Sequence, residues 1–335
     1  MPHNASGIRS VALDSTEHRI KNEINNTLFL SVGKCLIRQT RTDMTDLFGN
    51  KIIKDELLRD RFIEPPFSIL DSKTGNWRKR VNQWKKLGLE SDVGRSKYLI
   101  NGIENLNKLI KNKIPKHKVN SGTSIFDPAL AELIYHWFCP KNGLILDPFA
   151  GGSVRGIVAN YMGYKYTGID IRKEQIESNR EQALNILEIN NQPQWYFGDS
   201  NIELDRNFNH KFDLIFSCPP YSNLEVYSDL EGDISNMKYE DFIISYKNII
   251  IKSVNHLKKG GFACFVVGEV RDKTGNYIGF VPDTIQAMKE SGLKYYNECI
   301  YLSGLGGACL TAGRIMTASK KVKKIHQNVL VFIKP

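Results

Sequence analysis

The sequence predicts an α/β protein with a doubly wound, seven-stranded, mostly parallel sheet and a basic, largely helical N-terminal extension. Two observations predict the sheet. Short apolar runs alternate with amphipathic helical patterns over the last ~200 residues. Acidic and small residues follow several of these runs, where the strands should end. Because ligands of such sheets bind beyond the carboxyl ends of the strands, we expect a binding site along that edge.

The elements follow one another in a regular order. The first strand runs into a glycine turn over 143–152, and the helix after it ends at Gly163, a common helix stop. The helix over 239–261 has a cationic end followed by glycines, and the next has a proline near its start. The remaining strands are expected at 164–171, 194–199, 211–220, 262–270, 294–302 and 327–335, and the helices at 153–163, 172–187, 239–261 and 281–292.

Bulk properties exclude several classes of protein. The chain has 335 residues, and 41% of them are hydrophobic, as in soluble globular proteins. No apolar run approaches the ~18 residues of a membrane span, and the N-terminus lacks the apolar centre of a signal peptide. The six cysteines include no C-x-x-C pair, which argues against a zinc site and a disulfide framework. We therefore expect a cytoplasmic protein with no metal.

The net charge of +10 is concentrated in one segment. Between Lys73 and Lys118 there are 13 lysines and arginines against 3 acidic residues, while the rest of the chain is balanced. Such a segment indicates a polyanionic partner, although a solvated lysine-rich surface explains it about equally well. We predict a domain boundary near 120, with a basic extension over 1–120 and the sheet domain over 121–335.

Two basic regions are candidate nucleic-acid contacts. Trp77 and Trp84 lie one heptad apart among cations, a pattern that can stack bases and bind phosphates. The alternative is that both rings face the core. Residues 302–324 are glycine-rich and then basic, and form either a flexible DNA-facing loop or a long hairpin connection. The candidate residues are Trp77, Arg78, Lys79, Arg80, Lys85, Lys86, Arg314, Lys320 and Lys321.

Three acidic residues are expected along the carboxyl edge of the sheet. Asp147 opens a loop with Gly151 and Gly152, Asp170 follows 23 residues later, and Asp199 ends the third strand. An acid at the position of Asp170 can accept hydrogen bonds from ribose. A dinucleotide would also suit a glycine loop, but Asp147 would repel a pyrophosphate and attract an ammonium. This points to a cofactor like S-adenosylmethionine, although the glycine loop alone does not distinguish such a site from an ordinary strand–glycine–helix turn.

The fourth strand brings Cys218-Pro219-Pro220-Tyr221 to the same edge. Taken together, DPFAGGS, GID, GDS and FSCPPY resemble the motifs of the N4-cytosine and N6-adenine amino-methyltransferases of DNA. The resemblance covers residues 121–335, including TSIFDPALAELIYHW before the first strand and KIHQNVLVFIKP at the end. The N-terminal 120 residues look similar to extensions of phage-type modification methylases.

This resemblance implies a Rossmann-like fold, S-adenosylmethionine as cofactor, and double-stranded DNA with a flipped target base as substrate. It also implies restriction–modification, without identifying the base or the recognised sequence. The implied catalytic residues are Cys218, Pro219, Pro220 and Tyr221. The implied cofactor-binding residues are Phe126, Asp147, Phe149, Ala150, Gly151, Gly152, Asp170, Ile171, Asp199 and Ser200.

The chemistry explains the two prolines. The lone pair of an exocyclic amine is delocalised into the base, so acceptors aimed at its protons favour methylation. The carbonyl of Pro219 is such an acceptor, held rigidly and without a competing N–H on the prolines. Tyr221 can stack on a base rotated out of the duplex.

Cys218 departs from the family pattern, because that position normally holds Asp, Asn or Ser, and sulfur is a weak acceptor. Ser217 should point to the other side of the strand. The cofactor loop also lacks the usual second spaced glycine. Three alternatives stay open: methylation of RNA, C5-cytosine methylation with Cys218 as nucleophile near Glu269, and a catalytically silent DNA-binding module. A second Pro-Pro segment, Glu64-Pro65-Pro66-Phe67, follows a stretch expected to be helical and is the less favoured candidate.

Overall fold

A computed structural model describes residues 36–37, 56–57, 61–90, 126–221, 232–303 and 308–335. The chain divides into two compact units, Met1–Pro66 and Phe67–Pro335. In the first, β1 (Leu36–Ile37) pairs antiparallel with β2 (Glu56–Leu57). Because β2 lies in the stretch expected to be helical before Glu64, that expectation was wrong at those two residues. The boundary near 120 falls outside the described residues and stays a prediction.

The second unit contains a sheet of eight strands among the described residues, in the order β3-β9-β10-β8-β7-β4-β5-β6. Only β10 runs antiparallel to its neighbours. The doubly wound, mostly parallel sheet is thus confirmed. The strands are β3 (Ile69–Asp71), β4 (Leu144–Asp147), β5 (Lys165–Asp170), β6 (Gln194–Phe197), β7 (Phe212–Ser217), β8 (Leu257–Val267), β9 (Lys294–Leu302) and β10 (His326–Ile333).

The eighth strand, β3, was not predicted. It has only three residues, too few for an alternating pattern, and it pairs parallel with β9 at the sheet edge. It comes from the segment assigned to the N-terminal extension. The described part of that extension is therefore less helical than the sequence suggested.

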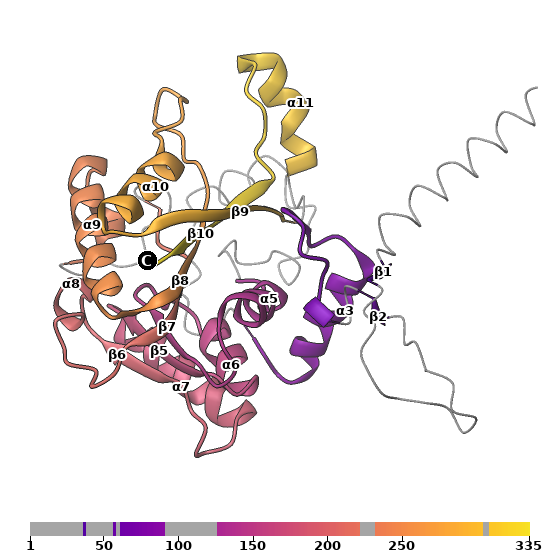
Figure 1. Cartoon of the computed structure of the whole chain (residues 1–335). Coiled ribbons are helices and arrows are strands. Elements are labelled where there is room, and N and C mark those ends of the chain that lie inside the picture. The colour runs from indigo at the N-terminus through magenta and orange to yellow at the C-terminus, as the bar shows by residue number, and fades with distance from the viewer. Residues whose placement is uncertain (1–35, 38–55, 58–60, 91–125, 222–231, 304–307) are drawn as a thin grey trace, which may run out of the picture. The chain divides into compact units, whose positions relative to one another are not determined.

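Helices cover both faces of the sheet (Figure 1). On one side α5 (Pro128–Phe138) packs on α6 (Val154–Tyr161), and α7 (Lys173–Ile186) follows β5. On the other, α9 (Tyr239–Asn255) contacts α8 (Ser200–Glu203), α10 (Phe280–Glu290) and the short 3-10 helix η2 (Ile234–Asn236). The strands between them are buried on both faces, which explains their nearly continuous apolar sequences.

The basic helix α3 (Gly75–Lys86) packs on α5 through polar contacts. The indole N–H of Trp77 donates to Asp127 Oδ2 at 2.8 Å, and Arg80 forms an ion pair with Glu132 at 2.9 Å. The side chains of Trp77 and Trp84 are only 2% and 6% exposed. Trp77 is therefore not available for base stacking, and Arg80 already has a carboxylate partner. Both were predicted as nucleic-acid contacts.

Residues 302–324 do not form only a flexible loop. They contain α11 (Ala308–Ser319), which lies between the antiparallel neighbours β9 and β10 and has no buried residue. Figure 1 shows α11 extending away from the sheet. Arg314 and Lys320 are exposed, and the ammonium of Lys321 lies 3.4 Å from the carbonyl oxygen of Thr274.

Candidate active site

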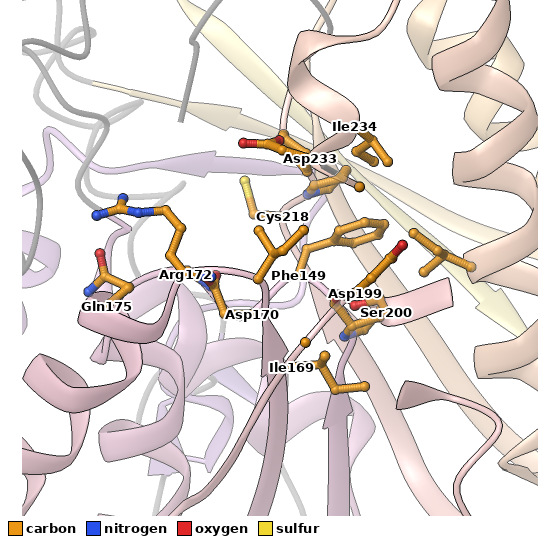
Figure 2. A pocket seen from close by; sticks show the side chains of 18 of the residues that line it. Phe149, Ile169, Asp170, Arg172, Gln175, Asp199, Ser200, Cys218, Asp233 and Ile234 are labelled. Atoms are coloured by element: carbon orange, nitrogen blue, oxygen red, sulfur yellow. Dashed lines mark hydrogen bonds between the residues drawn. The ribbon is translucent and has the colours of Figure 1, made fainter. Parts of the chain in front are cut away.

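The strand register brings the predicted acids to one edge of the sheet. Asp147 pairs with Gly168, and Asp170 with Phe197 on the next strand. A cavity of about 140 Å³ opens at this edge. Figure 2 shows Phe149, Asp170, Asp199 and Cys218 around it. Side chains from four strand ends therefore surround one space, as the sequence predicted for a cofactor site.

Asp147 is fully buried, and each of its carboxylate oxygens has two partners. Oδ2 accepts from Arg155 Nε at 2.6 Å and from the hydroxyl of Tyr166 at 2.7 Å. Oδ1 accepts from the hydroxyl of Ser217 at 2.6 Å and from the backbone N–H of Phe149 at 3.1 Å. Asp147 therefore connects β4 to β5, β7 and α6.

This arrangement differs from the expectation that Asp147 attracts an ammonium group of the cofactor. The residues that line the cavity do not include Asp147, Ala150 or Gly152, although all three were predicted to bind cofactor. The charge of Asp147 is compensated by Arg155, because a buried carboxylate requires a partner. We did not predict a role for Arg155. Its one sequence signal is an arginine within the otherwise apolar turn of a helix, SVRGIVA.

Burial opposes a charge on Arg155, but Asp147 outweighs it and raises the pKa of Arg155 above its usual value. The guanidinium also lies over the ring of Phe126, with Cζ 4.7 Å from the ring centroid. Arg155 and Phe126 both line the cavity. The positively charged guanidinium of Arg155 therefore lines the cavity that we expected the carboxylate of Asp147 to line.

Asp170 lies at the end of β5, where two backbone donors fix its carboxylate. Oδ2 accepts from the N–H of Gly151, and Oδ1 from the N–H of Arg172, both at 2.8 Å. Burial raises the pKa of Asp170, and these two hydrogen bonds act in the opposite direction. Gly151 has φ of +51°, a conformation that favours glycine at this close approach. Ile171 and Gln175 line the same part of the cavity.

Asp199 caps α8 by accepting from the N–H of Asn201 at 2.8 Å. The next residue, Ser200, donates to the carbonyl oxygen of Pro148 and so ties the first loop to the third. Opposite lies Gly232, where an added Cβ would be 3.1 Å from Asp199 Oδ2. Gly232, Asp233 and Ile234 line the cavity, a contribution that the sequence did not reveal. The sequence also offers a polar loop after the Pro-Pro motif as a candidate to close over a substrate, with Asn223, Glu225, Tyr227 and Asp229, and these residues lie outside the described part of the chain.

Cys218, Pro219, Pro220 and Tyr221 follow β7 and line the cavity. Ser217 faces the opposite side and binds Asp147, as expected from strand alternation. The hydroxyl of Tyr221 accepts from Gln327 Nε2 at 3.0 Å. Its ring meets Phe280 edge to face, with 5.7 Å between centroids.

A second, open cleft of about 710 Å³ adjoins this cavity. Phe126, Cys218 and Tyr221 line both spaces. Cationic side chains also line the cleft: Arg78, Lys85 and Lys324. Burial lowers the pKa of Lys324, whereas Glu269 and Glu298 oppose that shift. Glu269 lines the cleft too and accepts from the N–H of Val281 at 3.0 Å.

The second Pro-Pro segment has a different setting. Glu64, Pro65 and Pro66 belong to the first compact unit, and Phe67 begins the second. The segment precedes the edge strand β3, whereas Cys218 follows the buried strand β7 between β4 and β8.

In the described part of the chain, no group of three His, Cys, Asp or Glu side chains could hold a metal ion. Over the same residues, no helix has the length and apolarity to cross a membrane.

Comparison with known proteins agrees with the resemblance inferred from the motifs. Residues 50–181 match the family model described as DNA methylase, of the N6/N4 type. This segment is therefore similar to part of an N6/N4 DNA methylase domain, and that family implies S-adenosylmethionine as cofactor. The matched range includes both Glu64-Pro65-Pro66-Phe67 and the loop after Asp147, and it ends before Cys218. The choice between the two Pro-Pro segments therefore rests on geometry.

A release factor glutamine methyltransferase of Fusobacterium nucleatum is 32% identical over 136 residues, which are 37% of this chain and 36% of the relative. The match thus spans about a third of that relative's length. Among solved structures, a TehB-like SAM-dependent methyltransferase from Corynebacterium glutamicum has a TM-score of 0.39 at 19% identity, covering 70% of this chain and 97% of that one. The magnesium protoporphyrin IX methyltransferase of Synechocystis has a TM-score of 0.42 at 11% identity, covering 70% and 94%.

The buried carboxylate of Asp147 gives a stability prediction. Asp147→Asn places an amide where Arg155 and Tyr166 need an acceptor, so the guanidinium loses its counter-charge. We expect the free energy of unfolding to fall by about 3–5 kcal/mol, as for other broken buried ion pairs. Urea denaturation measures this change. Asp205→Asn is the matched control, because its exposed pair with Lys252 should contribute less than about 1 kcal/mol. Equal losses in the two variants would contradict the role given to Asp147.

Proposed function

We propose that this protein transfers a methyl group from S-adenosylmethionine to the exocyclic amine of a base in DNA, at N6 of adenine or N4 of cytosine. One observation carries the proposal. The cofactor cavity and the open cleft meet at Phe126, Cys218 and Tyr221. A methyl donor on one side and an acceptor on the other would therefore approach each other beside the Pro-Pro motif.

The cavity residues fit the adenosine part of the cofactor. Asp170 is held by two backbone N–H groups and can accept from the ribose hydroxyls. Asp199 follows the next strand, β6, and can accept from the adenine amine, with Ile171 against the ring. Phe149 and the backbone of Gly151 line the same cavity. When bound, S-adenosylmethionine supplies a methyl group activated by its sulfonium.

The motif after β7 fits a planar amine as acceptor. The carbonyl of Pro219 can accept one proton of the amine, and the adjacent Pro220 has no N–H to compete for it. Tyr221 presents a ring fixed by Phe280 and Gln327, against which a flipped base can stack. Preorganised contacts of this kind reduce the cost of orienting the reactants. Cys218 lies at the junction as a weak second acceptor.

Exposed cations around the cleft support DNA as the substrate. Arg78 and Lys85 of α3 line the cleft, and Lys79 and Lys86 of the same helix are exposed. Arg314 in α11, and Lys320 and Lys321 just after it, are further cations outside the cleft lining. Phosphate contacts fix the position of a protein on DNA, while contacts with bases determine the sequence that it recognises. We also propose that the protein methylates DNA at a defined sequence, as a modification methylase does.

A second candidate acceptor is the side-chain amide of a protein. The similarity to a release factor glutamine methyltransferase favours it. An amide nitrogen also has a delocalised lone pair, so the same Pro-Pro motif suits it chemically. Methylation of RNA, methylation at C5 of cytosine and a silent DNA-binding module are three further candidates, and one experiment separates all of them.

In that experiment, the protein and labelled S-adenosylmethionine are incubated in three separate reactions, with duplex DNA, with RNA and with a protein extract. Mass spectrometry of the nucleosides and peptides then identifies the methylated atom. We expect N6-methyladenine or N4-methylcytosine in DNA. Methylglutamine, a methylated RNA base or C5-methylcytosine would each replace the proposal by the corresponding reaction. Binding of DNA with no transfer to any acceptor would support the silent module.

Replacing Tyr221 tests which Pro-Pro segment holds the substrate. We expect Tyr221→Ala to lower turnover by about 100-fold or more, because an acceptor misplaced by ~1 Å reacts that much more slowly. Cofactor affinity, measured by calorimetry, should change little. The control is Phe67→Ala, which removes the 48% exposed ring of the other segment and should leave turnover intact. The reverse pattern would assign the substrate site to residues 64–67.

Cations of α3 give a salt-dependence prediction. Lys85→Ala and Lys86→Ala should each weaken DNA binding across all sequences and lower the slope of log K against log salt by about 1. Fluorescence anisotropy at several salt concentrations measures both quantities. Lys289→Ala removes an exposed charge from α10, outside the cleft, and should change neither. Unchanged slopes in the α3 variants would exclude these lysines from the phosphate contacts.

A further inference from the structure

Arg155 lines the cofactor cavity although it is only 5% exposed. Three hydrogen bonds hold one side of its guanidinium. Nε donates to Asp147 at 2.6 Å, and Nη2 donates to the carbonyl oxygens of Phe149 at 2.6 Å and Ala150 at 2.9 Å. Within the described part of the chain, the remaining nitrogen, Nη1, makes no hydrogen bond. Two N–H donors of a fixed cation are therefore available to a ligand.

Arg155 and the groups assigned to adenosine come from different elements around the cavity. Asp170 ends β5 and Asp199 follows β6, whereas Arg155 belongs to α6 and packs against Phe126. Its charge also interacts with Cys218. Because Phe126 and Cys218 mark the junction with the cleft, the amino-acid part of the cofactor should extend towards Arg155.

The charge presented at this end of the cavity is positive. The carboxylate of Asp147 is fully buried and has four hydrogen-bond donors, so it has no remaining capacity to bind an ammonium. A guanidinium binds carboxylates through charge-assisted hydrogen bonds, which are stronger than neutral ones. This end of the cavity therefore offers Arg155 as a partner for the carboxylate of a methionine group, whereas Asp147 offers no acceptor to its ammonium.

We propose that Nη1 of Arg155 binds the α-carboxylate of the methionine part of S-adenosylmethionine. This inference rests on the proposed function, and it assigns the methionine part to a residue outside the recognised motifs. It also reverses the expectation from the sequence, in which Asp147 would bind the ammonium. Asp147 instead orients the guanidinium that receives the carboxylate.

Two ligands that each lack one charge test the inference without altering the protein. Calorimetry compares S-adenosylhomocysteine with its decarboxylated analogue, which keeps the amine, and with its deaminated analogue, which keeps the carboxylate. We expect loss of the carboxylate to weaken binding about 10- to 100-fold, the usual effect of losing a hydrogen bond between charged groups. Loss of the amine should have a smaller effect. If the decarboxylated analogue binds as well as the parent thioether, the inference is wrong.

Variants then identify the residue. In Arg155→Gln, the difference in affinity between S-adenosylhomocysteine and its decarboxylated analogue should shrink to about threefold or less, because interacting groups show non-additive effects. Arg172→Gln is the matched control, since Arg172 lines the same cavity beside Asp170. It should affect both ligands equally. A full carboxylate effect retained in Arg155→Gln would overturn the assignment.

Circular dichroism checks that each variant is folded. If Arg155→Gln does not fold, the ligand comparison on the unmodified protein still tests whether the site binds the carboxylate. The outcomes also separate the inference from the function on which it rests. Absence of binding by S-adenosylhomocysteine itself would refute the cofactor site, and the inference with it. Tight binding that is insensitive to the carboxylate would refute only the role of Arg155.

Discussion

The site depends on the buried ion pair between Asp147 and Arg155. The carboxylate joins β4, β5 and β7 to α6, and the guanidinium bonds back to the loop between β4 and α6. A buried charge is costly unless it is paired and hydrogen-bonded. Here each partner satisfies the other and several neutral groups, so the loop over Phe149–Gly151 is held in one conformation. The positions of Asp170 and Cys218 relative to each other follow from this network.

A second carboxylate, Asp127, connects α3 and β9 to the start of α5. It caps α5 through the N–H of Ala129, and it accepts from the indole of Trp77 and the hydroxyl of Tyr301. Since Phe126 precedes it, the same residue fixes a ring that lines both cavity and cleft. The basic helix α3 is thus not an independent appendage. Its exposed lysines are held in a defined position beside the cleft.

The sequence predicted most of the fold because strand and helix periodicities are strong in a doubly wound sheet. It predicted Asp170, Asp199 and Tyr221 because strand ends meet at one edge. It did not predict Arg155, because no motif shows that Asp147 is buried and needs a cationic partner, nor Gly232, which is distant in sequence from its neighbour Asp199. It left open whether Trp77 and Trp84 face the core, because the spacing of a basic amphipathic helix does not tell which face is buried, and the structure shows both rings buried. The short strand β3 depends on pairing with β9 rather than on its own pattern.

Ser217 and Cys218 point to opposite sides at the end of β7, so one contributes to the stability of the sheet and the other lines the candidate site. Ser217 belongs to the buried network that stabilises the sheet, while its neighbour faces the junction of cavity and cleft. Under the proposed function, substitution of Cys218 should alter acceptor chemistry first, whereas substitution of Ser217 should alter stability first. Substrate preference and stability would then depend on two adjacent residues that can be varied separately.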